Sequence, residues 1–142
     1  MIDAIGILKL THGQNMTEAQ AVVLLLALFG IKHFIVDFLL QRKYQYANKG
    51  VYGHPGGILH AGLHGIATAL VLWLFADINW ILMMMAFDAF LHYHIDWAKT
   101  NINAKMGWTA TTHDEFWWLL GLDQLLHWLT YVVIIGWTIG AF

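Results

Sequence analysis

The stretch TEAQAVVLLLALFGIKHFIVDFLLQ (residues 17–41) decides the fold, because it is long and apolar enough to cross a membrane as one helix. About 20 apolar residues, each rising about 1.5 Å, cross a hydrocarbon core. The end of the run departs from this pattern, since His33, Asp37 and Gln41 follow one another at intervals of four. Such spacing places side chains on one face of a helix. The run therefore predicts a membrane helix with a polar face near one end.

The composition extends this interpretation to the whole chain. Of its 142 residues, 59% are hydrophobic and only 11% are charged, which excludes an ordinary soluble domain. Three further apolar runs cover about residues 58–76, 80–98 and 116–140. We predict an all-α polytopic membrane protein, in which four transmembrane helices form an antiparallel bundle as a single domain over residues 1–142. The chain has no cysteine, so disulfides and thiolate metal sites are excluded.

The sequence before the first span does not resemble a cleaved signal. Met1–Gln14 contains one lysine, and no small-residue cleavage site follows the apolar run. We expect Asn15 or Thr17 to cap the first helix, and Ile5–Leu10 to lie along the membrane interface. Pro55, in a glycine-rich joint at residues 52–57, is expected to stop a helix between spans one and two.

Basic residues predict the orientation in the membrane. The two loops on one face carry Arg42, Lys43, Lys49, Lys99 and Lys105, whereas the opposite face has only Lys9. Cytoplasmic loops are enriched in lysine and arginine. We therefore expect an inner-membrane protein with both termini outside.

Each predicted span carries metal-competent side chains four residues apart: His33/Asp37, His60/His64, Asp88/His92/Asp96 and Asp123/His127. The groups fall late, early, late and early in successive helices, so alternating helices bring them to one level near the cytoplasmic face. Helix bundles build metal sites from such facing side chains. The predicted metal ligands are His33, Asp37, His60, His64, His92, Asp96, Asp123 and His127.

The donor chemistry narrows the choice of ion. Nitrogen and oxygen donors without sulfur favour Zn, with Mn or Fe as alternatives. So many donors indicate two ions, or one ion with further carboxylates that orient its histidines. A single pair such as Asp123/His127 is more often an interhelical hydrogen bond than a ligand set. Four pairs at one depth favour the metal site over a purely structural polar network.

The motifs HFIVDFLLQ (33–41), LHAGLHG (59–65), LHYHIDWAK (91–99) and LDQLLHW (122–128) together resemble the bacterial membrane family known as domain of unknown function 3307. The resemblance covers most of the chain and implies no particular activity. It adds Gln41, Lys99 and Gln124 to the candidate site and offers no equivalent for Asp88. A looser likeness to membrane-bound metal-dependent hydrolases is an analogy only.

The leading functional hypothesis is metal-dependent hydrolysis of a phosphoester or lipid-like substrate at the cytoplasmic face. Asp37 or Asp88 would serve as general base, and Lys99 would meet an anionic substrate. The bilayer and an anionic lipid or phosphoester are the expected partners. Nothing in the sequence indicates nucleic-acid binding, and the oligomeric state stays open.

The main alternative is a proton or metal-ion transporter or channel that uses the same residues. Such a path needs polar groups through the full membrane thickness. The outer half offers little beyond Thr68, Thr130 and Tyr131, which favours a one-sided site in a monomer. A di-iron oxidase would predict glutamates inside the spans, whereas the only one in the four runs is Glu18 at the very start of the first, and a non-catalytic metal-stabilised adaptor stays open.

Overall fold

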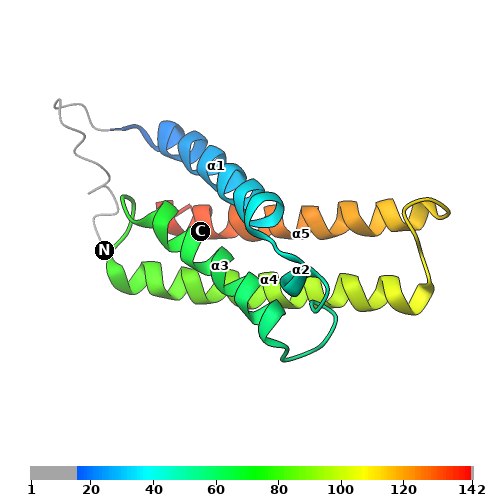
Figure 1. The fold of residues 1–142 in the computed structure, drawn as a ribbon. Helices are drawn as coiled ribbons and strands as arrows, with labels where there is room; N and C mark the ends of the chain where they lie inside the picture. The colour runs from blue at the N-terminus through cyan, green and yellow to red at the C-terminus, as the bar shows by residue number, and fades with distance from the viewer. Residues whose placement is uncertain (1–15, 142) are drawn as a thin grey trace.

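The computed structural model describes residues 16–141, and every regular element in that range is helical (Figure 1). The elements are α1 (Glu18–Phe34), the π-helix η1 (Ile35–Leu40), α2 (Lys43–Tyr46), α3 (Pro55–Leu72), α4 (Ile78–Met106) and α5 (Asp114–Ile139). The all-α prediction is confirmed. The predicted interfacial segment Ile5–Leu10 lies outside the described residues.

Four main helices form the bundle. Helices α4 and α5 run side by side as a long antiparallel hairpin, and α1 and α3 cross them at an incline (Figure 1). Helix α3 packs on α4, while α1 contacts both α3 and α5, so the four helices surround one interior. The short α2 packs against α3.

Local sequence signals set the start of two helices. The Thr17 hydroxyl accepts the Gln20 N–H, and the Gln20 side chain accepts the Thr17 N–H, which completes the predicted cap of α1. Pro55 differs from expectation, because it begins α3 instead of stopping a helix. Proline suits the first helical position, where its missing N–H has no intrahelical partner. The His54 ring caps the new end by accepting the Gly56 N–H.

Three of the described helical segments are long and apolar enough to cross a membrane: Glu18–Leu40, Pro55–Leu72 and Asp114–Ile139. Four spans were predicted from the sequence. Helix α4 has 29 residues, which is ample length, but its acidic and basic residues make it too polar for the same criterion. Length and composition therefore indicate membrane association through at least these three segments.

The distribution of side chains is reversed relative to a soluble protein. Large apolar side chains cover the outside, with Phe38 67%, Leu70 71% and Trp73 66% exposed. The buried side chains are polar as often as apolar. Such an exterior suits contact with lipid, because the hydrocarbon core favours apolar surface.

The interior divides along its length. One half is an apolar cluster formed by Leu25, Phe29, Leu72, Phe75, Ile81, Met84, Tyr131, Ile134 and Ile135. These residues come from the middle of α1, the first part of α4, the last parts of α3 and α5, and the turn that follows α3. The buried histidines and aspartates follow this cluster along α1 and α4 and precede it along α3 and α5. The polar groups therefore gather in one half of the bundle, as the order of their positions predicts.

A close approach of α3 to α4 depends on Gly65. A Cβ atom at this position would lie only 2.7 Å from the backbone oxygen of Met85 and 3.1 Å from the Ala89 side chain. Small residues allow membrane helices to pack this closely. The contact brings the histidines of α3 against those of α4.

Substitution of Gly65 by alanine should therefore separate these helices. We expect Gly65→Ala to lower the free energy of unfolding by about 1–3 kcal/mol, because the added methyl group overpacks the contact. Gly62→Ala is the matched control in α3, since a Cβ there meets nothing within 4 Å. It should be neutral or stabilising by up to about 1 kcal/mol, because alanine favours helix more than glycine. Unfolding in mixed micelles by increasing dodecyl sulfate would measure both, and equal effects would contradict the packing account.

Candidate metal centre

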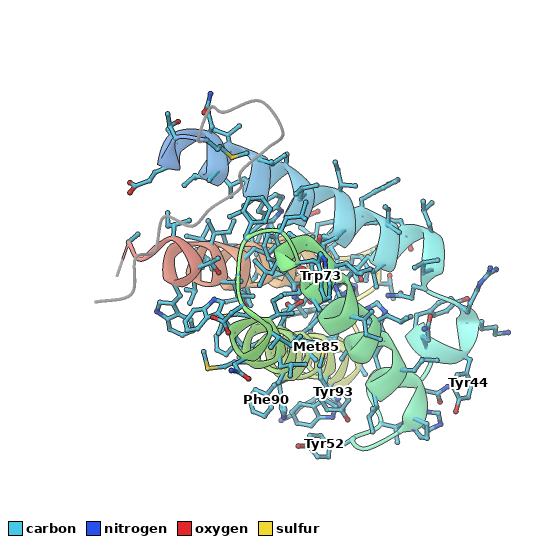
Figure 2. All side chains as sticks on the ribbon, turned by 90° about the vertical axis from the view of Figure 1, so that its left-hand side faces the viewer. Tyr44, Tyr52, Trp73, Met85, Phe90 and Tyr93 are labelled. Carbon is cyan, nitrogen blue, oxygen red and sulfur yellow. The ribbon has the colours of Figure 1, made fainter. Side chains whose placement is uncertain are left out.

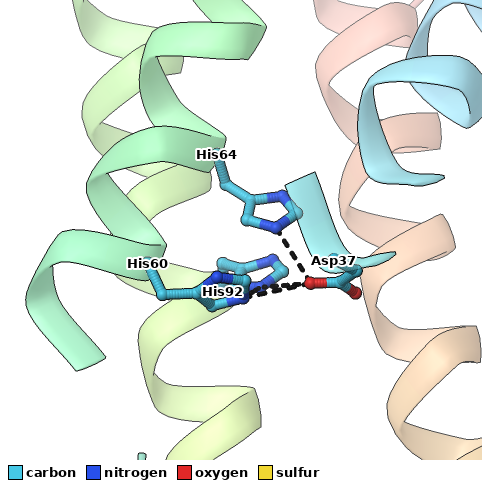
Figure 3. A group of neighbouring side chains, drawn as sticks. All are labelled: Asp37, His60, His64 and His92. Atoms are coloured by element: carbon cyan, nitrogen blue, oxygen red, sulfur yellow. Dashed lines mark hydrogen bonds and ion pairs between the residues drawn. The ribbon is translucent and has the colours of Figure 1, made fainter. Parts of the chain in front are cut away.

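Four donor atoms converge in the polar half of the bundle (Figure 3). Asp37 Oδ1, on η1, lies 3.0 Å from His60 Nε2 and 3.1 Å from His64 Nε2, both on α3. It also lies 3.9 Å from His92 Nε2 on α4. The His60 and His92 Nε2 atoms are themselves 3.1 Å apart. Three separate elements thus direct donor atoms to one point.

Three of these four separations are close to those in a metal coordination shell. Zinc bonds to nitrogen and oxygen of about 2.0–2.1 Å in a tetrahedron place the ligand atoms roughly 3.3 Å from one another. Hydrogen bonds alone satisfy the arrangement poorly. His60 Nε2 lies within 3.4 Å of Asp37, Gln41, His92 and Asp96, and a ring nitrogen carries at most one proton. The buried group can therefore hold a metal ion, which would satisfy all four donors at once.

A second group of potential ligands consists of His92, Asp96 and His127, whose donor atoms lie within 4.8 Å of one another. The rings of His64, His92 and His127 form a stack, with centroids 3.5 Å and 4.1 Å apart in successive pairs. Within residues 16–141, the buried His92 Nδ1 and His127 Nε2 have no hydrogen-bond partner. His92 is common to both groups, so the two candidate sites are joined.

His33 lies outside both groups and supports Asp37 from the other side. Its Nε2 is 3.1 Å from Asp37 Oδ2, the oxygen that does not face the three imidazoles. Its Nδ1 is 2.8 Å from the Tyr131 hydroxyl. Partners of this kind orient the residues that bind a metal. The structure thus gives His33 the position of an orienting residue.

Asp123 also lies outside both groups. Its Oδ1 is 3.6 Å from His127 Nε2, and its Oδ2 accepts a hydrogen bond from the Gln124 amide at 3.1 Å. The Gln124 carbonyl oxygen is in turn 3.0 Å from His33 Nε2. Lys99 Nζ approaches Asp123 Oδ2 at 3.9 Å. Gln124 therefore connects the two residues that orient the cluster, His33 and Asp123.

Asp88, a predicted general base, is held in a separate ion pair. Its Oδ2 lies 2.6 Å from Lys32 Nζ and accepts the Thr68 hydroxyl at 2.6 Å. Lys32 also donates to the backbone oxygen of His64 at 3.3 Å. The side chains of Lys32 and Asp88 are only 5% and 1% exposed, so this is a buried pair. It lies beside the cluster and belongs to neither ligand group.

Two features of the centre have no clear signal in the sequence. Asp37 lies in the six-residue π-helix η1, and wide turns of this kind are frequent at functional sites. Lys49, which the sequence marks only as a basic loop residue, places its Nζ 2.7 Å from Asp96 Oδ2. The Lys49 contact depends on how the chain folds back after α1.

One cavity in the described part of the chain lies away from the candidate metal centre. It has a volume of about 380 Å³ and an apolar lining from α3, α4 and the segment before α3 that includes Tyr52, Phe90 and Tyr93. Figure 2 shows these three rings together at the edge of the bundle beside α3 and α4. None of the candidate ligands lines this cavity. The candidate metal centre is therefore separate from this cavity.

The structure is therefore a helical bundle whose length and composition indicate membrane association and whose buried histidine and aspartate cluster is a candidate metal centre. Residues 24–141 match the family described as protein of unknown function (DUF3307), and the chain belongs to this family. The match includes every motif that carries the resemblance. No curated protein and no solved structure matches the chain.

Proposed function

We propose that the chain is a membrane-embedded metal protein that hydrolyses a phosphoester at the cytoplasmic surface. The observation that carries the proposal is the convergence of Asp37 Oδ1 with three imidazole nitrogens at 3.0, 3.1 and 3.9 Å. Ionisable groups inside a bilayer are costly unless they meet one another, a cavity or a metal. A divalent ion at such a centre supplies a Lewis acid and a nucleophile from water at neutral pH.

The donor atoms favour zinc, with manganese or iron as alternatives, because they are nitrogen and oxygen without thiolate. Because His92 belongs to both ligand groups, the number of ions bound decides how many ligands each ion has. An ion in the second group takes His92 and leaves Asp37, His60 and His64 to the first ion. Three protein ligands and an open position are typical of catalytic zinc. Two ions therefore leave room for a substrate, whereas one ion held by all four donors does not.

Hydrolysis forms a bond from water oxygen to phosphorus and breaks the ester P–O bond, and a proton passes to the leaving oxygen. Asp37 is the proposed general base, oriented by His33 through its second oxygen at 3.1 Å. Asp88 is not assigned to this reaction, because it is paired with the buried Lys32 and belongs to neither ligand group. Lys99, with a side chain 27% exposed, is proposed to meet the anionic substrate.

The proposed site faces the cytoplasm, and α4 is proposed to cross the membrane as the fourth span. Its polar side chains Asp88, His92 and Asp96 are buried inside the bundle, which removes them from contact with lipid. The basic residues Arg42, Lys43, Lys49, Lys99 and Lys105 all belong to the two connections, or the helix ends beside them, at the polar end of the bundle. Such a bias is typical of the cytoplasmic side and leaves both termini outside.

The packing gives less support to a proton or metal-ion transporter. A transport path needs polar groups across the whole membrane. Beyond Thr68 and Asp88, the described interior is filled by the apolar cluster that contains Phe29, Met84 and Ile134. This closed half favours a site that opens to one side only.

Phosphoester hydrolysis can be tested with the purified protein in detergent, loaded with zinc or manganese. We expect release of nitrophenolate from 4-nitrophenyl phosphate or its diester, and a loss of at least about 100-fold in Asp37→Asn, because that residue both binds metal and accepts the proton. Asp114→Asn, which changes an exposed acid at the start of α5, should retain the wild-type rate. Equal rates for wild type and Asp37→Asn would exclude this hydrolase function.

A further inference from the structure

The segment of residues 47–54 between α2 and α3, here called the strap, is tied to α4 by three hydrogen bonds, one of them between the Tyr52 hydroxyl and His94 Nε2 at 3.3 Å. The Asn101 amide donates a hydrogen bond of 3.0 Å to the Gly50 carbonyl. The Gly53 N–H donates one of 2.6 Å to the Tyr93 hydroxyl. Gly50 lies so near α4 that a Cβ there would be 3.0 Å from the Thr100 side chain. The strap therefore lies directly against α4 beside the metal centre.

Lys49 extends from the strap into the centre. Its Nζ is 2.7 Å from Asp96 Oδ2, and its side chain is only 12% exposed. The same oxygen lies 3.3 Å from His92 Nε2 and 3.4 Å from His60 Nε2. Long basic side chains near a membrane surface ordinarily extend toward water. Lys49 instead places its positive charge on the carboxylate oxygen that faces the histidines.

A divalent ion bound to Asp96 Oδ2 would compete with this ammonium group. Two cations on one carboxylate oxygen repel each other strongly in a buried site. Binding of an ion would therefore release Lys49 from Asp96, while the tied strap would keep it beside the centre. An unpaired ammonium group beside a divalent ion favours an oxyanion as the third partner.

We propose that Lys49 binds the anionic oxygen atoms of a phosphate-class ligand at the metal centre, and that Asp96 holds it until a metal ion binds. This inference rests on the proposed function, because it requires an ion in the centre. The proposal gives the strap a role in ligand binding. The positions of the basic residues in the sequence indicate only the orientation in the membrane. The ligand group is a phosphate, carried either by a lipid headgroup or by a soluble ester.

The test compares wild type with Lys49→Ala, Lys49→Arg and Lys105→Ala in nanodiscs of phosphatidylcholine. Lys105 is exposed near the end of α4 and serves as the control. Competition with a chromophoric chelator would measure zinc affinity, and calorimetry would measure inorganic phosphate binding to the zinc-loaded protein. Lys49→Ala should bind zinc about tenfold more tightly, because no ammonium group competes for Asp96, and phosphate about tenfold more weakly, because one charged contact to phosphate is lost. Lys49→Arg should retain phosphate binding.

Phosphatidic acid in the nanodisc distinguishes the two sources of phosphate. If inorganic phosphate binds wild type and Lys105→Ala more weakly in discs that contain phosphatidic acid than in discs of phosphatidylcholine alone, a lipid headgroup is the ligand; if it binds equally in both, a soluble ester is. Lys49→Ala that binds zinc and phosphate as wild type does would overturn the Lys49 proposal and leave the metal centre intact. Absence of zinc binding in every variant would overturn both proposals.

Discussion

Asp88→Leu should destabilise the protein by about 3–5 kcal/mol, because it leaves the Lys32 ammonium buried without its partner. Lys32 Nζ lies 2.6 Å from Asp88 Oδ2, and its side chain is only 5% exposed. The remaining contacts, to the His64 carbonyl at 3.3 Å and over the Tyr131 ring at 4.5 Å, do not neutralise the charge. The free energy of unfolding in mixed micelles would measure the loss.

The double variant Lys32→Met/Asp88→Leu is the matched control. It removes both charges, and apolar replacements of a buried ion pair are often neutral or stabilising. We expect it to recover most of the stability lost by Asp88→Leu and to keep its bound metal, since neither residue belongs to a ligand group. A double variant as unstable as the single one would show that the charge of Lys32 is not the cause.

His92→Ala and His127→Ala should each remove the ion of the second group, because both residues are among its three ligands. Each variant should keep the ion held by Asp37, His60 and His64, and so about half of the wild-type metal. Loss of a residue that merely orients a ligand lowers metal affinity roughly 10–100-fold, and loss of a ligand costs more. Elemental mass spectrometry of each purified variant would give the number of ions retained.

His94→Ala controls for the loss of a histidine from the same helix. His94 lies two residues beyond His92, outside both ligand groups, and its Nδ1 lies 2.7 Å from the Phe90 backbone oxygen. It should keep the full metal content. Complete loss of metal from His92→Ala and His127→Ala alike would contradict the two-ion arrangement and indicate a single ion.

Helical periodicity accounts for which side chains lie together inside the bundle. Residues four apart share a helix face, so His60 with His64 and His92 with Asp96 were expected to face one interior. The sequence could not decide which of the eight predicted ligands point at an ion and which support them. That distinction depends on ring orientation, which places His33 Nε2 against Asp37 Oδ2 and away from the histidine group.

Tertiary contacts account for what the sequence did not indicate. Nothing in the residues 35–40 distinguishes a π-helix from an α-helix, although it positions Asp37. Lys49 reaches Asp96 only because the strap is tied to α4 through Asn101 and Tyr93, which lie far along the chain. In helix α4, the polar residues that build the site lower the mean hydropathy. This helix is therefore not among the segments that length and composition indicate as membrane spans.

The most direct test of the metal centre is the metal content of the wild-type protein purified in detergent, measured by elemental mass spectrometry. The arrangement of Asp37, His60, His64 and His92, joined through His92 to Asp96 and His127, predicts about two equivalents of zinc, manganese or iron per chain. Well-folded protein that holds no metal, and whose thermal stability does not rise when zinc, manganese or iron is added, would contradict it.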